Sequence, residues 1–525
     1  MKCFPAEKLR LSVVQLGLWI SLVAAPGMCM AAGVHADEKA GAPGCAHESA
    51  QQCVTAALEA MGGRERLRKV ASIRMETTGH TLLMEQSYRQ SPFITSYERE
   101  HITLDLANQR LLNEAKLTWP ESDPNQSDSD TTLVVGVEGG VYRTKFGDSP
   151  CSLSALEAAR QVLALGPARV LMTAADSTDL HFEAPQTVRS TAHAVIAFTW
   201  RHIPVRVLLN PFNHLPDALE TTQVFHDFWY FWGDVRQRIY FDNWKLVQGI
   251  TFPTNWVEER NGTVWSSVQA LNVEFNVEID EKLFAMTPGA VKQSAASPGW
   301  NHPFSVKEAT ALAPGVDLFA GSWNATVVKE PDGLVILEAP ISGLYVQGVL
   351  NEARKRHPGL AVTAVLSTSD SWPHTGGVRQ AVSLGLPVYI LDLNRPLLDR
   401  MMSAPHTLEP DALENSKRAK TKLPWRIVAS KQELGSGPNR MELYPLRGAA
   451  TERQYMVYFP EHRLLYASDT LALNDDGSLY DPELMYEVAQ AVKRENLTVD
   501  TVFAMHQGPL PWAQVMALID KSRQS

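Results

Sequence analysis

The 525-residue sequence has few cysteines and no concentrated positive charge. None of its five cysteines belongs to a Cys-x-x-Cys pair, which excludes the usual pattern of a structural zinc knuckle. The formal net charge is −10, and no long run of lysine and arginine occurs. A surface that neutralises nucleic-acid phosphates needs clustered cations, so we expect no nucleic acid among the partners.

Three common enzyme motifs are also missing. The chain has no Walker-type phosphate loop, no G-x-S-x-G nucleophile elbow and no G-x-G-x-x-G dinucleotide fingerprint. Beyond the N-terminus, no segment reaches the about 18 consecutive apolar residues that mark a membrane-crossing helix. These absences argue against three common enzyme classes and against a later membrane span.

The N-terminus has the pattern of a secretory signal peptide at residues 1–36. Lys2, Lys8 and Arg10 precede an apolar stretch at 11–25, and small residues follow. This stretch is shorter than the about 20 residues that a membrane span needs, which favours a cleaved leader over an uncleaved anchor. We therefore expect an exported, periplasmic protein that associates with the cell envelope or a membrane surface.

Cleavage of this leader would leave three cysteines, Cys45, Cys53 and Cys151. In an oxidising compartment, Cys45 and Cys53 could pair across a short loop and leave Cys151 free. The alternative is a pair of free thiols near the terminus. The sequence leaves both open.

The length of the chain and its changes in pattern predict two main domains. A chain this long exceeds what one hydrophobic core supports. Residues 50–290 are rich in strand-like runs, and 287–302 has the small residues, prolines and glycines of a linker. Over 303–525, strands and helices alternate, which indicates an α/β domain.

The N-terminal domain is predicted to begin with a helix at 53–70, weakened by two central glycines, and to continue as strands. An Asn-Gly pair at 261–262 between two alternating runs predicts a β-hairpin. This order of features resembles the curved antiparallel sheet of lipoprotein-carrier-like domains, which implies an apolar concave face. The aromatic run FWYFW at 228–232 either joins the core and an interface with the next domain or lines a ligand site.

Four segments of the C-terminal domain carry a second resemblance. They are a hairpin at 324–340, the loop TSDSWPHTGG at 368–377, a strand pair at 458–469 and a strand leading into His506 at 502–508. In this order they resemble the opening hairpin, the H-x-H-x-D-H-x-G-G loop, the bridging aspartate and the last histidine of the metallo-β-lactamase fold. The resemblance implies an αββα sandwich of that hydrolase superfamily.

Most of the metal ligands that this resemblance implies are replaced. Ser369, Ser371 and Pro373 stand where the family has two histidines and an aspartate. No histidine occurs at 444–448, where a further one would be expected. One of the family's two metal positions is therefore lost.

Three ligands remain, namely His374, Asp469 and His506. Such a mixed set can hold one zinc, iron or manganese ion with a water in an open position. The ion would lower the pKa of that water and make hydroxide available to attack an ester-like or amide-like bond. Asp370 or Glu338 could add a further oxygen, although neither matches a ligand position of the family.

Three functions remain open. The first is a hydrolase for an apolar small-molecule substrate, with at most one ion on His374, Asp469 and His506. The second is a metal-free enzyme in which His374 is the base and Asp469 or Asp370 orients it. The third is a non-catalytic envelope protein that binds a ligand or a partner on a degenerate hydrolase fold. The cofactor is accordingly one metal ion or none.

Other residues are weaker candidates. Trp372 and Arg447 are expected to flank the site, and Arg447 would either neutralise an anionic substrate or form a structural salt bridge. His357, His406 and His462 lie in polar stretches and are expected to be surface histidines.

Overall fold

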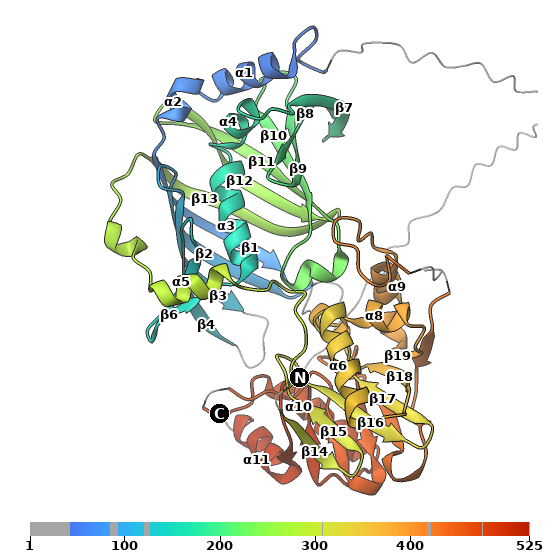
Figure 1. Cartoon of the computed structure of the whole chain (residues 1–525). Coiled ribbons are helices and arrows are strands. Elements are labelled where there is room, and N and C mark those ends of the chain that lie inside the picture. The colour runs from blue at the N-terminus through green and yellow to red at the C-terminus, as the bar shows by residue number, and fades with distance from the viewer. Residues whose placement is uncertain are drawn as a thin grey trace, which may run out of the picture. The chain divides into compact units, whose positions relative to one another are not determined.

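The computed structural model describes residues 42–84, 93–119, 126–306, 308–416, 422–474 and 476–523. The predicted leader at 1–36 lies outside these residues. Within them, no helix has the length and apolar character that a membrane span requires. Three sheets organise the described chain (Figure 1).

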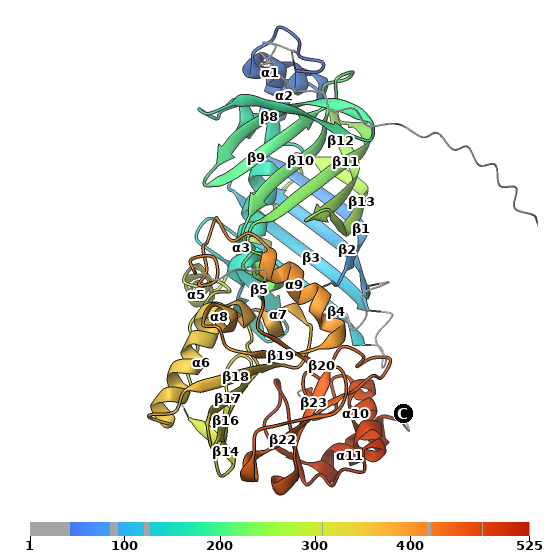
Figure 2. The same ribbon diagram turned by 90° about the vertical axis from the view of Figure 1, so that its right-hand side faces the viewer.

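The first sheet is antiparallel, and its strands lie in the order β6-β5-β4-β3-β2-β1-β13-β12-β11-β10-β9-β8-β7. The chain runs outward from β1 to β6 and returns from β7 at the far edge, so its first and last strands pair inside the sheet (Figure 2). The strands are β1 Ser72–Leu82, β2 Thr95–Asp105, β3 Arg110–Trp119, β4 Gln126–Val135, β5 Gly140–Thr144, β6 Gly147–Pro150, β7 His181–Val188, β8 Thr191–Trp200, β9 Ile203–Leu209, β10 Pro216–Gln223, β11 Val235–Val247, β12 Ile250–Arg260 and β13 Thr263–Phe275.

The predicted hairpin at 261–262 is confirmed as the connection between β12 and β13. Arg260 pairs with Thr263, so the loop has two residues. Asn261 has φ 49° and Gly262 has φ 81°, the left-handed values that a tight hairpin turn requires.

Four helices of this part of the chain are α1 Ala50–Ala60, α2 Arg64–Arg68, α3 Leu153–Leu165 and α4 Val170–Ala175. The prediction of one helix at 53–70 was wrong, because Gly62 and Gly63 have φ 116° and 96° and separate α1 from α2. Cys45 and Cys53 form a disulfide, and Cys151 is a buried free thiol. Helices α1, α3 and α4 share one apolar core with the sheet. The lipoprotein-carrier resemblance remains a prediction beyond this antiparallel sheet and its helices.

The other two sheets follow in the chain. One has the order β14-β15-β16-β17-β18-β19-β20 and the other β21-β22-β23-β24-β25-β26. Their strands are β14 Ala309–Ala313, β15 Val316–Phe319, β16 Ala325–Glu330, β17 Gly333–Leu337, β18 Val362–Ser367, β19 Val388–Leu391, β20 Trp425–Val428, β21 Gln432–Leu434, β22 Met441–Pro445, β23 Tyr455–Phe459, β24 Leu464–Tyr466, β25 Thr501–Phe503 and β26 Leu510–Pro511. The helices are α5 Pro288–Ala295, α6 Gly343–Arg356, α7 Trp372–Thr375, α8 Val378–Ser383, α9 Arg395–Ser403, α10 Pro482–Arg494 and α11 Trp512–Ser522.

Alternating side chains show that these two sheets face each other between helices. Leu334 and Ile336 of β17 pack into a cluster with α6. Val335 and Leu337 face the opposite way, into a core shared with β23. The residues of β23 divide in the same manner between that shared core and α10. Since strand side chains alternate between faces, the four layers are helix, sheet, sheet and helix.

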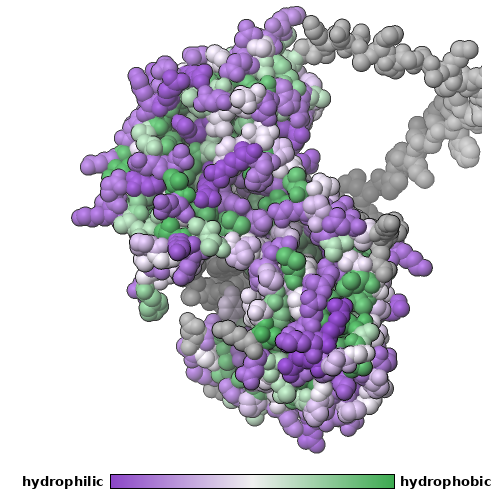
Figure 3. Space-filling model, viewed as in Figure 1, coloured by the Kyte–Doolittle hydropathy of each residue, from purple (hydrophilic) through white to green (hydrophobic). Residues whose placement is uncertain are grey.

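Helix α6 shows why an outer layer forms. Val349 and Leu350 are buried against the sheet, whereas Arg354, Lys355 and Arg356 in its last turn are exposed. Figure 3 shows a hydrophilic surface over this helix. An apolar stripe on a charged helix is stable only when the stripe is covered, as it is here.

The predicted linker at 287–302 contains helix α5, so it is not an unstructured connection. Pro288 begins the helix, and Ser294 Oγ accepts a hydrogen bond from the backbone N–H of Gly140 at 2.9 Å. All strands up to Phe275 lie in the first sheet, and those from Ala309 lie in the other two. The domain limits 50–290 and 303–525 stay predictions.

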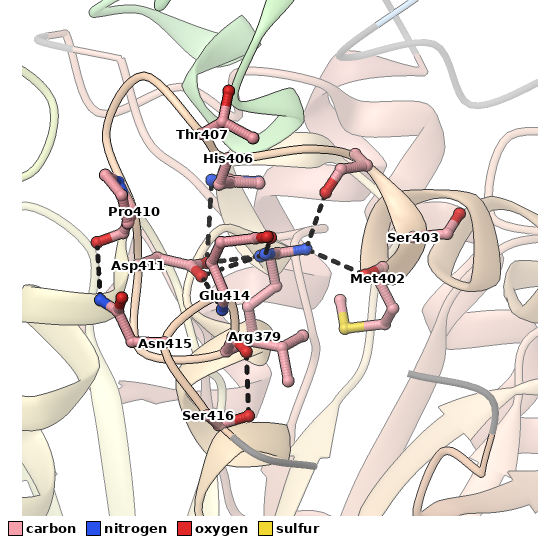
Figure 4. A network of polar contacts seen from close by, with 12 residues as sticks. Arg379, Met402, Ser403, His406, Thr407, Pro410, Asp411, Glu414, Asn415 and Ser416 are labelled. Carbon is pink, nitrogen blue, oxygen red and sulfur yellow. Dashed lines mark hydrogen bonds and ion pairs between the residues drawn. The ribbon is translucent and has the colours of Figure 1, made fainter. Parts of the chain in front are cut away.

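The segment at 404–416 is held by ion pairs and hydrogen bonds to the rest of the chain. Asp411 forms a two-point ion pair with Arg379 of α8, and Arg379 Nη1 donates to the carbonyls of Met401 and Met402 at 3.0 Å (Figure 4). His406 is only 3% exposed, so its prediction as a surface histidine was wrong. On the other side, Asp234 accepts hydrogen bonds from the backbone of residues 407 and 408.

We predict that Arg379→Met lowers the free energy of unfolding by about 3 kcal/mol, because it leaves the half-buried Asp411 carboxylate and helix-end carbonyls without their buried donor. Denaturant unfolding measures this. The control is Arg395→Met, which removes an exposed pair with Asp399 and should cost less than about 1 kcal/mol. Equal losses in the two variants would contradict the prediction.

Candidate metal centre

His374 lies in helix α7, which follows strand β18. Its backbone N–H donates to the carbonyl of Ser371 at 2.9 Å, and its side chain is 3% exposed. Gly376 and Gly377, which follow Thr375, pack too closely for any side chain, since a Cβ at Gly376 would meet the carbonyl oxygen of Ile341 at 2.2 Å. The segment that carries His374 is therefore pressed against the start of α6.

Asp469 and His506 follow two neighbouring parallel strands, β24 and β25. Tyr466 lies opposite Phe503, and each site residue comes three positions after its strand ends. Parallel strands end at the same edge of a sheet, so both side chains reach one place. Ser468 has φ 59°, a left-handed value that turns the chain before Asp469.

The three predicted ligands converge on one point. His374 Nε2 is 3.2 Å and His506 Nε2 is 3.0 Å from the same oxygen, Asp469 Oδ1. The two Nε2 atoms are 3.3 Å apart. His374 is buried, whereas the side chains of Asp469 and His506 are 21% and 29% exposed. The group therefore opens to solvent on one side.

These distances fit a metal ion. Donor atoms at 2.0–2.1 Å from a tetrahedral zinc ion are about 3.3 Å apart, which is close to the three separations found here. Two imidazole nitrogens and one carboxylate oxygen suit zinc, iron or manganese. In the described part of the chain, the other close group of potential ligands is Cys45, Glu48 and Cys53, whose sulfurs form the disulfide.

The ionisation states also suit a cation. Burial lowers the pKa of His374 to about 4, so its imidazole is neutral near neutral pH. Burial opposes ionisation of Asp469, but the neighbouring His374 and His506 outweigh it and hold the pKa of this carboxyl below its usual value. Metal ligands must be deprotonated, and these two are.

The structure does not bring Asp370 into this group. It lies outside the cluster of the three ligands, and its Oδ2 is 3.3 Å from Arg453 Nη1. Burial raises the pKa of Asp370 to about 7. Arg447, expected beside the site, forms a salt bridge with Asp392 at 2.7 Å.

Glu338 contributes no atom to the ligand cluster but lies in a buried polar network beside it. Its carboxyl accepts hydrogen bonds from Tyr466 Oη at 3.0 Å and from the hydroxyl of Thr368. The Thr368 and Ser468 hydroxyls are 2.6 Å apart. Burial raises the pKa of Glu338 to about 7. This network holds Ser468, and through it the backbone that carries Asp469.

Sequence reasoning missed Trp323, whose ring centroid is 5.7 Å from that of His374 and 5.9 Å from that of His506. Only its position just before the opening hairpin could have indicated it. Trp372 is buried against the aromatic run, which forms the 3₁₀ helix η1 Phe228–Trp232. Its ring centroid lies 4.7 Å from that of Trp229. The run thus packs on the short helix that carries His374.

No protein-family model and no curated protein sequence matches the chain. Among solved structures, similar ones include a stereoselective inverting sec-alkylsulfatase from Pseudomonas sp., at 13% identity and TM-score 0.31 over 41% of this chain and 40% of that one. Others are DIM-1 metallo-β-lactamase, at 14% identity and TM-score 0.33 over 42% and 99%, and a metallo-β-lactamase from Pontibacter korlensis, at 15% identity and TM-score 0.33 over 42% and 99%. The chain spans about two fifths of the alkylsulfatase. At these scores the likenesses carry no weight for function.

We predict that mild acid destabilises the metal-free protein through His374. The unfolded side chain takes up a proton near pH 6.5 and the folded one only near pH 4, so the unfolded state holds more protons between these values. The free energy of unfolding therefore decreases as the pH falls through this window. His374 should contribute about 2 kcal/mol of that decrease between about pH 7 and about pH 5.

Urea unfolding with a chelator present measures this effect. His374→Ala should lose about that much of the pH dependence, whereas the exposed control His181→Ala should behave as the unaltered protein. The same pH dependence in His374→Ala and in the unaltered protein would contradict the prediction.

Proposed function

We propose that this protein is a hydrolase of ester-like or amide-like bonds that uses one metal ion held by His374, Asp469 and His506. The observation that carries the proposal is the convergence of three donor atoms at 3.0–3.3 Å from one another, with one side open to solvent.

The three side chains would bind the ion and leave one side of it open to a substrate. His374 and His506 present Nε2 and Asp469 presents Oδ1 toward one point, and Trp323 covers one flank of the two imidazoles. When bound, an ion of the zinc type would lower the pKa of a coordinated water and polarise the substrate carbonyl. The partly exposed His506 and Asp469 leave room for a small substrate to approach.

A metal-free enzyme with His374 as the base is less consistent with these contacts. Nε2 of His374 faces Asp469, and Nδ1 is buried with no hydrogen-bond partner in the described part of the chain. Neither nitrogen therefore points to a place where a substrate proton could be taken. Asp370, the alternative residue for orienting His374, faces Arg453.

A single ion is favoured over two. Ser369, Ser371 and Pro373 supply no imidazole at the positions where the resembled family has ligands. Three protein ligands with an open position are enough for one catalytic ion but not for a pair.

A non-catalytic binding protein remains the second candidate, because one observation favours it. A histidine that binds a metal normally donates its other ring N–H to an acceptor, which orients the ring. The buried Nδ1 of His374 has none among the described residues. On this alternative, the same surface would bind a ligand without catalysing a reaction.

Metal analysis of the purified protein tests the proposal. We expect about one zinc, iron or manganese ion per chain, and a loss of at least about tenfold in affinity in His374→Ala, Asp469→Ala or His506→Ala, because each removes one of three ligands. The control His181→Ala should keep the ion. A preparation without metal, whose stability is indifferent to a chelator, would overturn the hydrolase in favour of the binding protein.

We also propose export to the periplasm, on the basis of the leader pattern at 1–36. The Cys45–Cys53 disulfide supports this, since such bonds persist in oxidising compartments. N-terminal sequencing of protein recovered from a periplasmic extract should find a new terminus near residue 37. Recovery only in the cytosolic fraction with an intact leader would contradict it.

A further inference from the structure

Trp323 joins the metal centre to further aromatic side chains. Its backbone is held by Tyr345, whose hydroxyl donates to the carbonyl of Trp323 at 2.5 Å. Its half-buried ring therefore has a defined place beside His374 and His506.

Two more rings extend this surface. The centroid of Trp300 is 5.6 Å and that of Phe228 is 6.3 Å from the centroid of Trp323. Phe228 and Trp300 are 5.2 Å apart in an edge-to-face arrangement. Trp300 Nε1 donates to the carbonyl of Ile341 at 2.9 Å, which fixes its ring. All three side chains are half-buried, so each keeps part of its surface accessible.

These three rings come from separate parts of the chain. Phe228 begins η1, which leads into β11 of the first sheet, Trp300 follows α5, and Trp323 precedes β16. The run η1 packs on Trp372 of α7, two residues before His374, and Phe228 contacts both other rings. The N-terminal part of the chain therefore supplies one wall beside the metal centre.

The charged side chains near the ligands are already paired with one another. Among the described residues, the ion pairs of Asp469 are those with His374 and His506, and no lysine or arginine joins them. Arg453 and Arg447 are engaged by Asp370 and Asp392. Recognition by burial of apolar surface is what the three rings offer.

We propose that Phe228, Trp300 and Trp323 form an aromatic subsite for the apolar group of a neutral carboxylic ester or amide. The assignment of the ester or amide bond as the group that reacts rests on the proposed function, whereas binding of the apolar group does not. In the hydrolysis of an ester, water oxygen bonds to the acyl carbon, the bond from that carbon to the leaving oxygen breaks, and one water proton ends on the leaving alcohol. The acyl chain lies along the rings, next to His374 and His506.

Paired substrates test the subsite. The holoenzyme is given methyl acetate and methyl hexanoate, and acid release is followed in a pH-stat. Each buried methylene increases the binding constant by up to about fourfold. We therefore expect kcat/KM to be at least about tenfold higher for the hexanoate. Equal values for the two esters would overturn the subsite and leave the hydrolase standing.

Variants assign the effect to these rings. Trp323→Ala and Phe228→Ala should each reduce the hexanoate-to-acetate ratio by at least about threefold, and Trp323→Phe should restore most of it because a ring remains. Phe212→Ala removes a phenylalanine that is 84% exposed in the turn between β9 and β10, and should leave the ratio unchanged. A ratio unaffected by Trp323→Ala, Trp323→Phe and Phe228→Ala alike would overturn the proposal.

A measurement without catalysis separates the two proposals. Saturation-transfer NMR of hexan-1-ol on the chelator-treated protein should show binding that weakens in Phe228→Ala. Binding without any ester hydrolysis would refute the hydrolase and support the subsite. If neither hydrolysis nor binding of hexan-1-ol occurs, both proposals fail.

Discussion

The parallel pairing of β24 with β25 is the constraint on which the candidate metal centre depends. Because Tyr466 lies opposite Phe503, the chain segments that follow leave the sheet at the same edge. Asp469 and His506 each lie three residues further on, so they meet. A shift of one residue in this register would turn one side chain to the opposite face. His374 comes from the other sheet, so the face-to-face packing of the two sheets is the second requirement.

The buried polar groups beside these ligands help to hold the turn before Asp469. A carboxyl such as that of Glu338 is costly to bury, and here hydrogen bonds from Thr368 and Tyr466 offset part of that cost. Glu338 and Ser468 both have positive φ, at 75° and 59°. Such conformations persist only where the surroundings enforce them, and they often occur at functional sites. The network that links these residues enforces the turn before Asp469.

The aromatic run in η1 gives the first sheet a part in the site. It packs on Trp372, and Phe228 reaches Trp323, which contacts both histidines. Just after η1 in the chain, Asp234 accepts hydrogen bonds from the segment that pairs with Arg379 of α8. Apolar contact and hydrogen bonds thus join the two parts of the chain near the short helix that carries His374.

The sequence by itself determined the local features, because turn chemistry and side-chain alternation act between near neighbours. It determined the hairpin at 261–262, the strands at 324–340, 458–469 and 502–508, and the three candidate ligands. Only the tertiary structure decided that His374 meets Asp469 and His506, which are 95 and 132 residues away, that Asp370 faces Arg453, and that His406 is buried. Those outcomes depend on which strands pair and which faces pack, and no short-range pattern encodes that.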